Sequence, residues 1–488
     1  MEPDAAALNA RAHLDGIRLR RACAMPVAVA ARICAAIVLS RARFWDVTTA
    51  LTRNIPHVTV TNVVRAASTM ADRKYDIVLF GVTGFTGKLA CEHLLSKGYP
   101  VRWAVCARTE AKARSVLASI ASRLGVPDDV LPPILVADLQ PSNSDPEHAR
   151  LRGVVRDAAV VITAAGPFEK YGEHLVRMCA EEGTHYADTT GESDFFRRCI
   201  DLHDATARAT GATIVSHCGN DCVPWDLAVL AAAELARDRF GPRTTLSAAS
   251  TFTELPPGVG ASGGTFATAI YQLGKKRGGS RTAFDPLLRL SDGSKSKEAT
   301  KVRSPKSDVY YEEFGAYGGP WIMQPVMGNC VRRSNALLGY NAGEEFAYSE
   351  AQLRHPSFIR WIADSSYNAL IGAAIYVPPL RALLPAPGEG PSREEMIAGY
   401  LKLHLRAEGK APDGKKFKVK GLMTFDEDTG YLCTGRMLAE SGVELLEAAK
   451  AGGEKKAGVL TPATAMGTSL LRRMERELPM KWEVEIAD

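Results

Sequence analysis

The sequence predicts an α/β protein with a doubly wound parallel sheet, into which a second, mixed α/β domain is inserted. Three observations carry this prediction. Residues 75–108 read as strand, glycine turn, helix and strand. Strand-like and helix-like stretches then alternate as far as Ser216. From about Thr244 this alternation stops and Thr and Ser alternate with apolar residues, which indicates a new domain.

The first unit has the composition of a dinucleotide-binding site. Apolar residues 77–80 run into the turn GVTGFTG, and an amphipathic helix follows at once. Glycine allows a tight turn, a close approach of backbone to pyrophosphate, and close helix–strand packing, while the helix N-terminus offers N–H groups to phosphate. We expect the turn to bind the cofactor through Gly81, Thr83, Gly84, Phe85, Thr86 and Gly87.

The residue after the second strand, 101–107, indicates which dinucleotide binds. A free ribose 2′-hydroxyl usually meets an acidic residue there, whereas a 2′-phosphate needs a cation. This chain has Arg108, with Lys112 and Arg114 a turn later. A guanidinium pairs bidentately with phosphate, so the sequence favours NADP over NAD. An ordinary solvated arginine at a helix start is the alternative.

The elements after Arg108 continue the same sheet. We expect a helix at 109–123 and strands at 134–137, 159–163, 185–188 and 213–216, with a helix at about 171–182. In such a sheet the ligand lies at the carboxyl ends of the strands. Further cofactor contacts are therefore expected from Asp138, near adenine, and from Ala165, Gly166 and Pro167 after the fourth strand.

The rest of the chain gives weaker signals. Residues 321–338 look strand-like and carry Arg332 and Arg333, residues 274–306 read as an exposed loop, and the apolar run 369–377 reads as a core helix or a membrane-surface foot. A strand at 417–425 and helices from 435 and from Pro462 follow. The expected division is an extension at 1–70, a dinucleotide-binding domain at 71–218, a substrate or dimerisation domain at 219–416, and a segment at 417–488 that returns to the first domain.

Composition excludes several classes of protein. The 60 basic and 55 acidic residues include nine arginines and four acids in residues 1–69, so 51 of each remain and the body is neutral. Because a neutral body has no excess of basic residues, the composition does not predict a nucleic-acid partner. Ten scattered cysteines without a CxxC pair fit a reducing compartment. His217, Cys218 and Cys222 match no zinc spacing, so no metal site is expected.

Residues 1–69 are rich in Ala, Arg and Val and end at Met70, directly before the first strand. Either they form a mitochondrial or plastid transit peptide, or Met70 is the true start and the protein is cytoplasmic. The run 25–40 carries Arg32 and is too short for a membrane span. A peripheral contact with a membrane or lipid droplet and a homodimer remain open.

Hydride transfer requires a positioned nicotinamide and a proton donor. The loops after the fourth to sixth strands offer polar side chains, of which Tyr171, Cys218 and Asp221 are the catalytic candidates; the others are Asp188, Glu192 and His217. Tyr171 comes first, because it follows Gly-Pro-Phe at a helix start; packing is the competing interpretation. Asp188 and Glu192 are expected to cap helices or order the ribose. A Ser/His/Asp pattern is missing, so the sequence does not support a hydrolase.

The chain resembles the saccharopine-dehydrogenase-like oxidoreductases, a group that includes mycobacterial trans-acting enoyl reductases. The resemblance runs from about Tyr75 to the C-terminus and rests on FGVTGFTG, AGPFEKYGE, HYADTTGE, GNDCVPWDL, SGGT, GRMLAES and GVLTPATAMG. It implies a Rossmann-like domain, an inserted mixed α/β domain and NADP dependence. It implies no single substrate.

Three functions are consistent with these features. The first is NADP-dependent reduction of a lipid-type or acyl-thioester (enoyl) substrate, as the resemblance suggests. The second is a saccharopine dehydrogenase acting on an amino-acid adduct, whose carboxylates would require arginines such as Arg332 and Arg333. The third is a nucleotide-binding scaffold without turnover, at a membrane or lipid-droplet surface.

Overall fold

The computed structural model describes residues 72–140, 146–256, 260–274, 301–302, 304–321, 323–354, 370–371, 373–452 and 456–487. All of them fall in one compact unit, 66–488. The extension at 1–70 lies outside the described residues.

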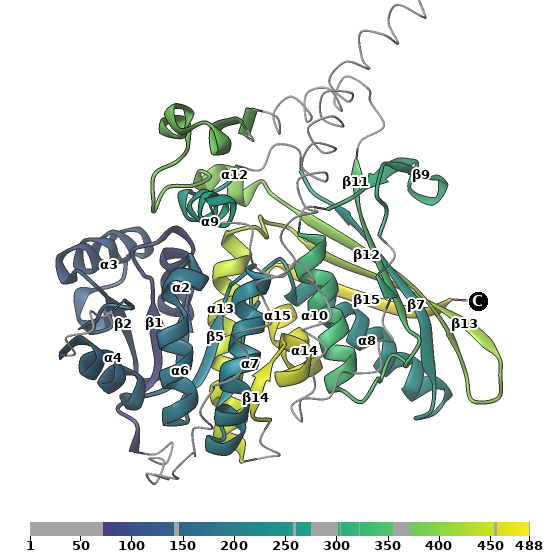
Figure 1. Cartoon of the computed structure of the whole chain (residues 1–488), viewed down its shortest axis with the longest axis horizontal. Helices are drawn as coiled ribbons and strands as arrows, with labels where there is room; N and C mark the ends of the chain where they lie inside the picture. The colour runs from purple at the N-terminus through teal and green to yellow at the C-terminus, as the bar shows by residue number, and fades with distance from the viewer. Residues whose placement is uncertain are drawn as a thin grey trace, which may run out of the picture. The chain divides into compact units, whose positions relative to one another are not determined.

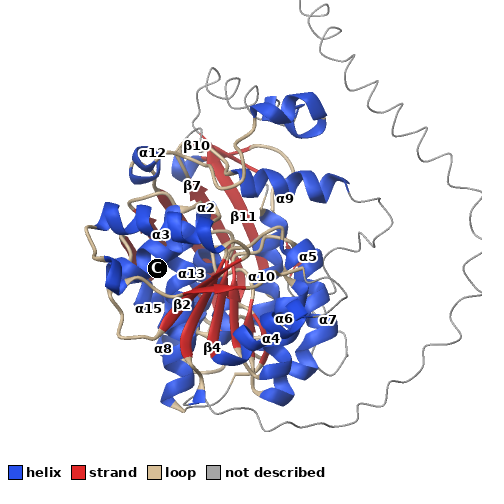
Figure 2. Ribbon diagram, turned by 90° about the vertical axis from the view of Figure 1, so that its left-hand side faces the viewer, coloured by secondary structure: helices blue, strands red, loops and turns tan. Residues whose placement is uncertain are grey.

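The first sheet has seven strands in the order β14-β6-β5-β4-β1-β2-β3, and every neighbouring pair is parallel (Figure 2). Its strands are β1 (Tyr75–Phe80), β2 (Trp103–Ala107), β3 (Ile134–Val136), β4 (Ala158–Thr163), β5 (His185–Asp188), β6 (Thr213–Val215) and β14 (Gly458–Leu460). From β1 the chain adds β2 and β3 on one side of the sheet, and then β4, β5, β6 and β14 on the other side. The switch point therefore lies between β1 and β4. The Rossmann-like arrangement predicted from the sequence is confirmed.

Helices cover both faces of this sheet because its central strands are apolar on both sides. On β1, Ile77 and Leu79 belong to one buried cluster, and Val78 and Phe80 to another. The first cluster includes side chains of α2 (Phe85–Lys97), α3 (Glu110–Leu124) and α13 (Leu432–Ala451). The second includes side chains of α4 (Pro146–Asp157), α5 (Phe168–Tyr171), α6 (Glu173–Glu182) and α7 (Ser193–Thr210).

The second sheet is mixed and has the order β15-β13-β12-β7-β11-β10-β9, with β8 also paired to β11 (Figure 1). Its strands are β7 (Thr245–Glu254), β8 (Lys301–Val302), β9 (Val309–Tyr311), β10 (Ala316–Gly319), β11 (Ala347–Arg354), β12 (Leu401–Lys410), β13 (Lys416–Phe425) and β15 (Met480–Ala487). Its helices include α8 (Val223–Phe240), α9 (Gly263–Gly274), α10 (Gln324–Leu337) and α12 (Arg393–Ile397). Short 3-10 turns lie at Asp128–Val130, Glu312–Phe314 and Pro378–Leu383.

The C-terminal segment contributes to both sheets. β13 lies in the second sheet, α13 packs on the first, β14 adds to the edge of the first, and β15 returns to pair with β13. The helices α14 (Pro462–Ala465) and α15 (Gly467–Glu477) connect β14 to β15. A boundary at 417 therefore places two strands of the second sheet, β13 and β15, in the returning segment.

The strand expected within 321–338 is wrong, since this segment forms the helix α10. Pro325 lies in its first turn, where a missing N–H leaves no hydrogen bond unmade. Val326 to Ala336 are buried without interruption. Because the helix is covered on all sides, its sequence shows neither a helical nor a strand period.

The run 369–377 does not form a core helix. Leu370, Tyr376 and Val377 expose 60%, 67% and 43% of their surface, although Ala374 is buried. Among the described residues, no helix is both long and apolar enough to cross a bilayer. Most of the loop expected at 274–306 lies outside the described residues.

Candidate functional site

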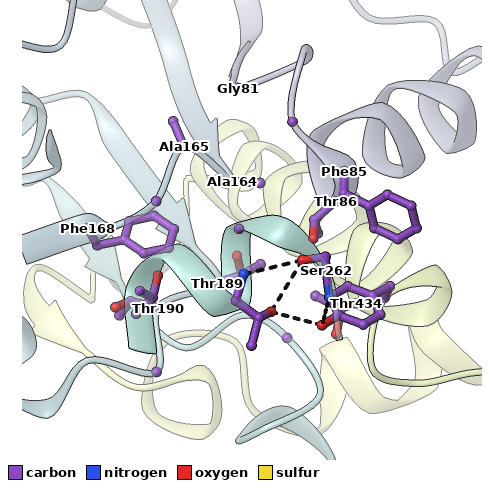
Figure 3. Close-up of a pocket in the computed structure, with 18 of the residues that line it drawn as sticks. Gly81, Phe85, Thr86, Ala164, Ala165, Phe168, Thr189, Thr190, Ser262 and Thr434 are labelled. Carbon is purple, nitrogen blue, oxygen red and sulfur yellow. Dashed lines mark hydrogen bonds between the residues drawn. The ribbon is translucent and has the colours of Figure 1, made fainter. Parts of the chain in front are cut away.

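A cavity of about 1320 Å³ lies at the carboxyl ends of the parallel strands. Figure 3 shows its lining from the glycine turn (Gly81, Phe85, Thr86), the loop after β4 (Ala164, Ala165, Phe168) and the loop after β5 (Thr189, Thr190). Ser262 of the second domain and Thr434 of the C-terminal segment, near the centre of the view, also line it. This volume exceeds the roughly 300–1,000 Å³ that is typical of one small ligand, so it suits a cofactor and a substrate together.

The glycine turn fits a dinucleotide. Gly81 has φ +86°, and a Cβ there would lie 2.9 Å from the backbone nitrogen of Ala165. A Cβ on Gly87 would overlap the carbonyl oxygen of Gly81. The turn can therefore close only with glycine at both positions, and the N-terminus of α2 then faces the cavity. Of the expected cofactor contacts, only Gly87 and Pro167 do not line it.

One end of the cavity is cationic. Arg108 and Lys112 line it and are exposed, next to Asp138 and Leu139 from the loop after β3. Among the described residues, Arg108 has no hydrogen-bond or ion-pair partner. Arg114 is instead paired with Glu110 on the surface of α3 and does not line the cavity. Arg108 is thus available to a phosphate, and Arg114 is not.

The opposite end is held together by buried carboxylates. Glu192 accepts hydrogen bonds from the backbone N–H groups of Phe168 (2.6 Å) and Glu169 (3.1 Å), which caps the short helix α5. Burial raises its pKa, and these hydrogen bonds oppose the rise. Asp188 is fully buried, does not line the cavity, and accepts from Tyr186 Oη at 2.8 Å and Thr190 N at 2.9 Å. Both carboxylates therefore order the loops.

Sequence reasoning did not select His217, although the structure directs its ring to the cavity. Its backbone is left-handed (φ +68°), a conformation that costs free energy in a residue with a Cβ and persists where the surroundings impose it. Its Nδ1 lies 2.6 Å from the Thr190 carbonyl oxygen, and its ring packs edge-on against Phe196 at 4.5 Å. Burial lowers the pKa of His217 to about 4.

The loop after β6 separates the two other catalytic candidates. Asp221 lines the cavity, and burial raises its pKa to about 6, while a hydrogen bond from Asn220 acts in the opposite direction. Cys218 is fully buried in the core, points its thiol at the Val215 carbonyl (3.7 Å) and does not line the cavity. Burial raises its thiol pKa, so the reactive thiolate is suppressed. Cys218 therefore has neither the access nor the ionisation that catalysis needs.

Tyr171 lines the cavity at the end of α5. It is half-buried, packs on the core beneath α6 and α7, and has Lys170 Nζ 4.9 Å from its ring centre. Its hydroxyl has no hydrogen-bond partner among the described residues. This half-buried position with a free hydroxyl fits both a proton donor and a packing residue. The variant Tyr171→Phe distinguishes the two roles.

Helix α9 forms a wall that sequence reasoning missed. Its cavity-lining residues, Gly264, Thr265, Thr268, Ala269 and Gln272, fall on one helical face. At one end Tyr431 Oη accepts a hydrogen bond from Ser262 N at 2.7 Å and shares another with Thr265 Oγ1 at 2.8 Å. At the other end Gln272 Nε2 donates to Glu192 at 3.0 Å. The small and polar residues repeating with helical spacing in SGGTFATAIYQ were the available signal.

A doubly wound sheet with this glycine turn and a cation after the second strand defines an NADP-dependent oxidoreductase. The family model for the saccharopine dehydrogenase NADP binding domain matches residues 77–215. A Mycobacterium tuberculosis protein provisionally named trans-acting enoyl reductase is 34% identical over 432 residues, covering 83% of this chain and 96% of the relative. The Mycobacterium leprae trans-acting enoyl reductase is 32% identical over 418 residues, covering 82% and 96%.

The chain therefore belongs to the saccharopine-dehydrogenase-like oxidoreductases, in the group that includes the mycobacterial trans-acting enoyl reductases. Among solved structures, saccharopine dehydrogenase (L-Glu forming) from Saccharomyces cerevisiae matches with a TM-score of 0.48 and 12% identity. That match covers 85% of this chain and 100% of the yeast chain.

Proposed function

We propose that the protein uses NADPH to reduce the carbon–carbon double bond of an enoyl thioester or a related lipid-type substrate. The relatives named trans-acting enoyl reductase support this choice. The distribution of charge in the cavity supports it independently.

The observation that carries the proposal is the absence of cations from the substrate end. Among the lining residues that the structure describes, the cations are Lys88, Arg108 and Lys112, all on α2 or at the start of α3. Around the loops after β5 and β6 the charged lining residues are acidic (Glu192, Asp194 and Asp221), and the others are neutral polar or apolar, including Thr190, Asn220, Leu255, Trp321 and Met323. Carboxylates placed there would be repelled and unpaired.

The positions of Arg332 and Arg333 argue against a role in binding an amino-acid adduct. Arg333 is 2% exposed, donates to the Val459 carbonyl at 2.7 Å and lies 5.8 Å from the Phe196 ring centre. Neither Arg332 nor Arg333 lines the cavity. An uncharged reacting group is therefore favoured over a substrate with several carboxylates.

The chain must add a proton to the substrate during reduction. When bound, NADPH supplies a hydride to one carbon of the double bond. Tyr171, whose hydroxyl has no other partner among the described residues, is the proposed donor of a proton to the neighbouring carbon. Asp221 is the alternative, since its pKa of about 6 leaves part of it protonated near neutral pH. The apolar wall of Leu255, Trp321 and Met323 limits access of water to the reacting carbons.

The test is NADPH oxidation, followed by absorbance, with enoyl thioesters of several chain lengths and, separately, with 2-oxoglutarate plus lysine. We expect turnover with enoyl thioesters only. Tyr171→Phe keeps the ring packing and should slow turnover about 100-fold or more with unchanged NADPH affinity. Asp221→Asn is the matched variant if Tyr171→Phe is fully active. Turnover only with 2-oxoglutarate and lysine would overturn the substrate assignment, and none with either would favour a scaffold.

A further inference from the structure

The loop after β6 holds an unused hydrogen-bond acceptor in a residue that lines the cavity. Asn220 is 7% exposed and lines it. Its backbone N–H donates to Thr434 Oγ1 at 2.9 Å, and its Nδ2 donates to Asp221 Oδ1 at 3.3 Å. Its Oδ1 is buried behind the cavity surface and has no partner among the described residues. The amide orientation follows from these contacts, because only Nδ2 can donate to a carboxylate.

His217, three residues earlier, presents a second acceptor. Its Nδ1 must carry the proton, because the Thr190 carbonyl can only accept. The pKa of about 4 keeps the ring neutral at physiological pH, so Nε2 holds a lone pair. Nε2 has no hydrogen-bond partner among the described residues and is not sealed from solvent, and His217 lines the cavity, so this nitrogen is available to a ligand there.

We propose that His217 Nε2 and, after a small rotation of its side chain toward the cavity, Asn220 Oδ1 form a subsite that binds the carboxamide N–H group of the nicotinamide ring and so fixes its orientation. Two acceptors require a ligand with donors, and a primary carboxamide carries two N–H bonds. A thioester carbonyl or a carboxylate offers none. The loop also follows a late strand, where the nicotinamide half of the cofactor belongs, whereas Arg108 and Asp138 lie at the adenine end.

The left-handed backbone of His217 fits this role. The strain at φ +68° persists because Nδ1 is tied to Thr190 and the ring is packed on Phe196, which together set the direction of Nε2. His217 and Asn220 are positioning residues in this proposal, since they donate no proton and accept no hydride.

The test compares three ligands by calorimetry, without substrate. NADP⁺ carries the carboxamide, its 3-acetylpyridine analogue replaces the NH₂ with a methyl group, and 2′,5′-ADP contains only the adenosine end. The variants are Asn220→Leu, which removes the acceptor but keeps similar bulk, and His217→Asn, which tolerates the left-handed backbone. 2′,5′-ADP affinity reports whether each variant has kept its fold.

We expect the wild type to bind NADP⁺ roughly tenfold more tightly than the acetylpyridine analogue. Each variant should reduce this preference to about threefold or less while binding 2′,5′-ADP as the wild type does. A wild type without the preference, or variants that keep it, would overturn the proposal. Because no substrate is present, the result does not depend on whether enoyl thioesters are reduced.

Discussion

Arg108 is the single residue from which we expect cofactor choice to follow. It is exposed at the cationic end of the cavity, and no described residue pairs with it. A charge-assisted bidentate contact to phosphate contributes roughly 1.5–3 kcal/mol. Arg108→Ala should therefore weaken NADPH binding by about one to two decades and leave NADH binding nearly unchanged, as measured by fluorescence titration.

Arg114→Ala is the matched control for Arg108→Ala. It removes the same charge six residues further along the chain, but Arg114 lies in α3, is paired with Glu110 and lies off the cavity. We expect it to alter neither affinity. Equal losses of NADPH and NADH affinity in Arg108→Ala would show that the guanidinium does not recognise the 2′-phosphate.

Asp226 makes stability depend on pH. It is 2% exposed, accepts from Ala463 N at 2.9 Å, and burial raises its pKa from 3.8 to about 6. The folded state therefore binds a proton that the unfolded state releases at lower pH, and this stabilisation is lost as pH rises through about 6. The whole loss, between about pH 4 and pH 6, amounts to at most roughly 3 kcal/mol, and about half of it falls above pH 5. In Asp226→Asn, the fall in melting temperature between pH 5 and pH 8 should be smaller than in the wild type.

Some of that fall will remain in Asp226→Asn. Asp188 and Asp221 also have raised pKa values, of about 7 and about 6, and they lose stabilisation in the same direction. A slope identical to that of the wild type would mean that Asp226 is ionised in the folded protein throughout this pH range.

In the loop after β6, the sequence could not predict which side chains face the cavity. The motif HCGNDC predicted functional side chains after β6, but not which of them face the ligand. The left-handed conformation of His217 directs its own ring to the cavity, while Cys218 points into the core. A backbone angle of this kind is imposed by tertiary contacts with Thr190 and Phe196, which local sequence does not reveal.

At the scale of elements, the sequence predicted helices and strands whose apolar or glycine residues have a regular spacing. It failed for elements that are buried on nearly every side and show no such spacing. The unit β1–α2–β2 was predictable because its glycines have the spacing that a tight strand-to-helix turn around a pyrophosphate requires. The helix α10 was not, because it is buried on nearly every side. The helix α9 has a clear face, but its small and polar residues point at a ligand cavity rather than at a core.

The packing of α13 on α2 gives an element-scale prediction. A Cβ on Gly435 would lie 2.8 Å from Leu89 Cβ and 2.9 Å from Ala90 N, and the backbone of α2 cannot yield easily. Gly435→Ala gains up to about 1 kcal/mol of helix propensity but should still destabilise the protein by roughly 1–3 kcal/mol through overpacking. Chemical denaturation measures the free energy of unfolding.

Gly153→Ala in α4 is the control for Gly435→Ala, because nothing lies within 4 Å of the added methyl group. It should gain the propensity term alone and stabilise by up to about 1 kcal/mol. If Gly435→Ala proved as stabilising as Gly153→Ala, the close approach of α13 to α2 would be refuted.

At the scale of the whole molecule, the chain joins parts that are far apart in sequence. β14 pairs with β6, and Thr213 Oγ1 donates to the Lys456 carbonyl at 2.6 Å. The return of the C-terminal segment was expected only from the family resemblance. Its further passage to β15 in the second sheet was not, because local periodicity identifies a strand without identifying its partner.

The start of the fold gives the last prediction, that the chain beginning at Met70 folds and binds NADPH like the full chain. Nine arginines and four acids set residues 1–69 apart from the neutral body. Arg73, by contrast, is 3% exposed and donates to the carbonyl of Arg156, to Thr184 Oγ1 (3.2 Å) and to the Glu182 carbonyl (2.7 Å).

Truncation on either side of Arg73 should therefore have opposite outcomes. A chain from Met70 keeps this guanidinium, which joins the turn before β5 to the ends of α4 and α6, and should match the melting temperature and NADPH affinity of the full chain. A chain from Tyr75 lacks it and leaves buried carbonyls without a donor, at a cost of roughly 1–3 kcal/mol. A lower melting temperature for the chain from Met70 would instead show that residues 1–69 stabilise the fold.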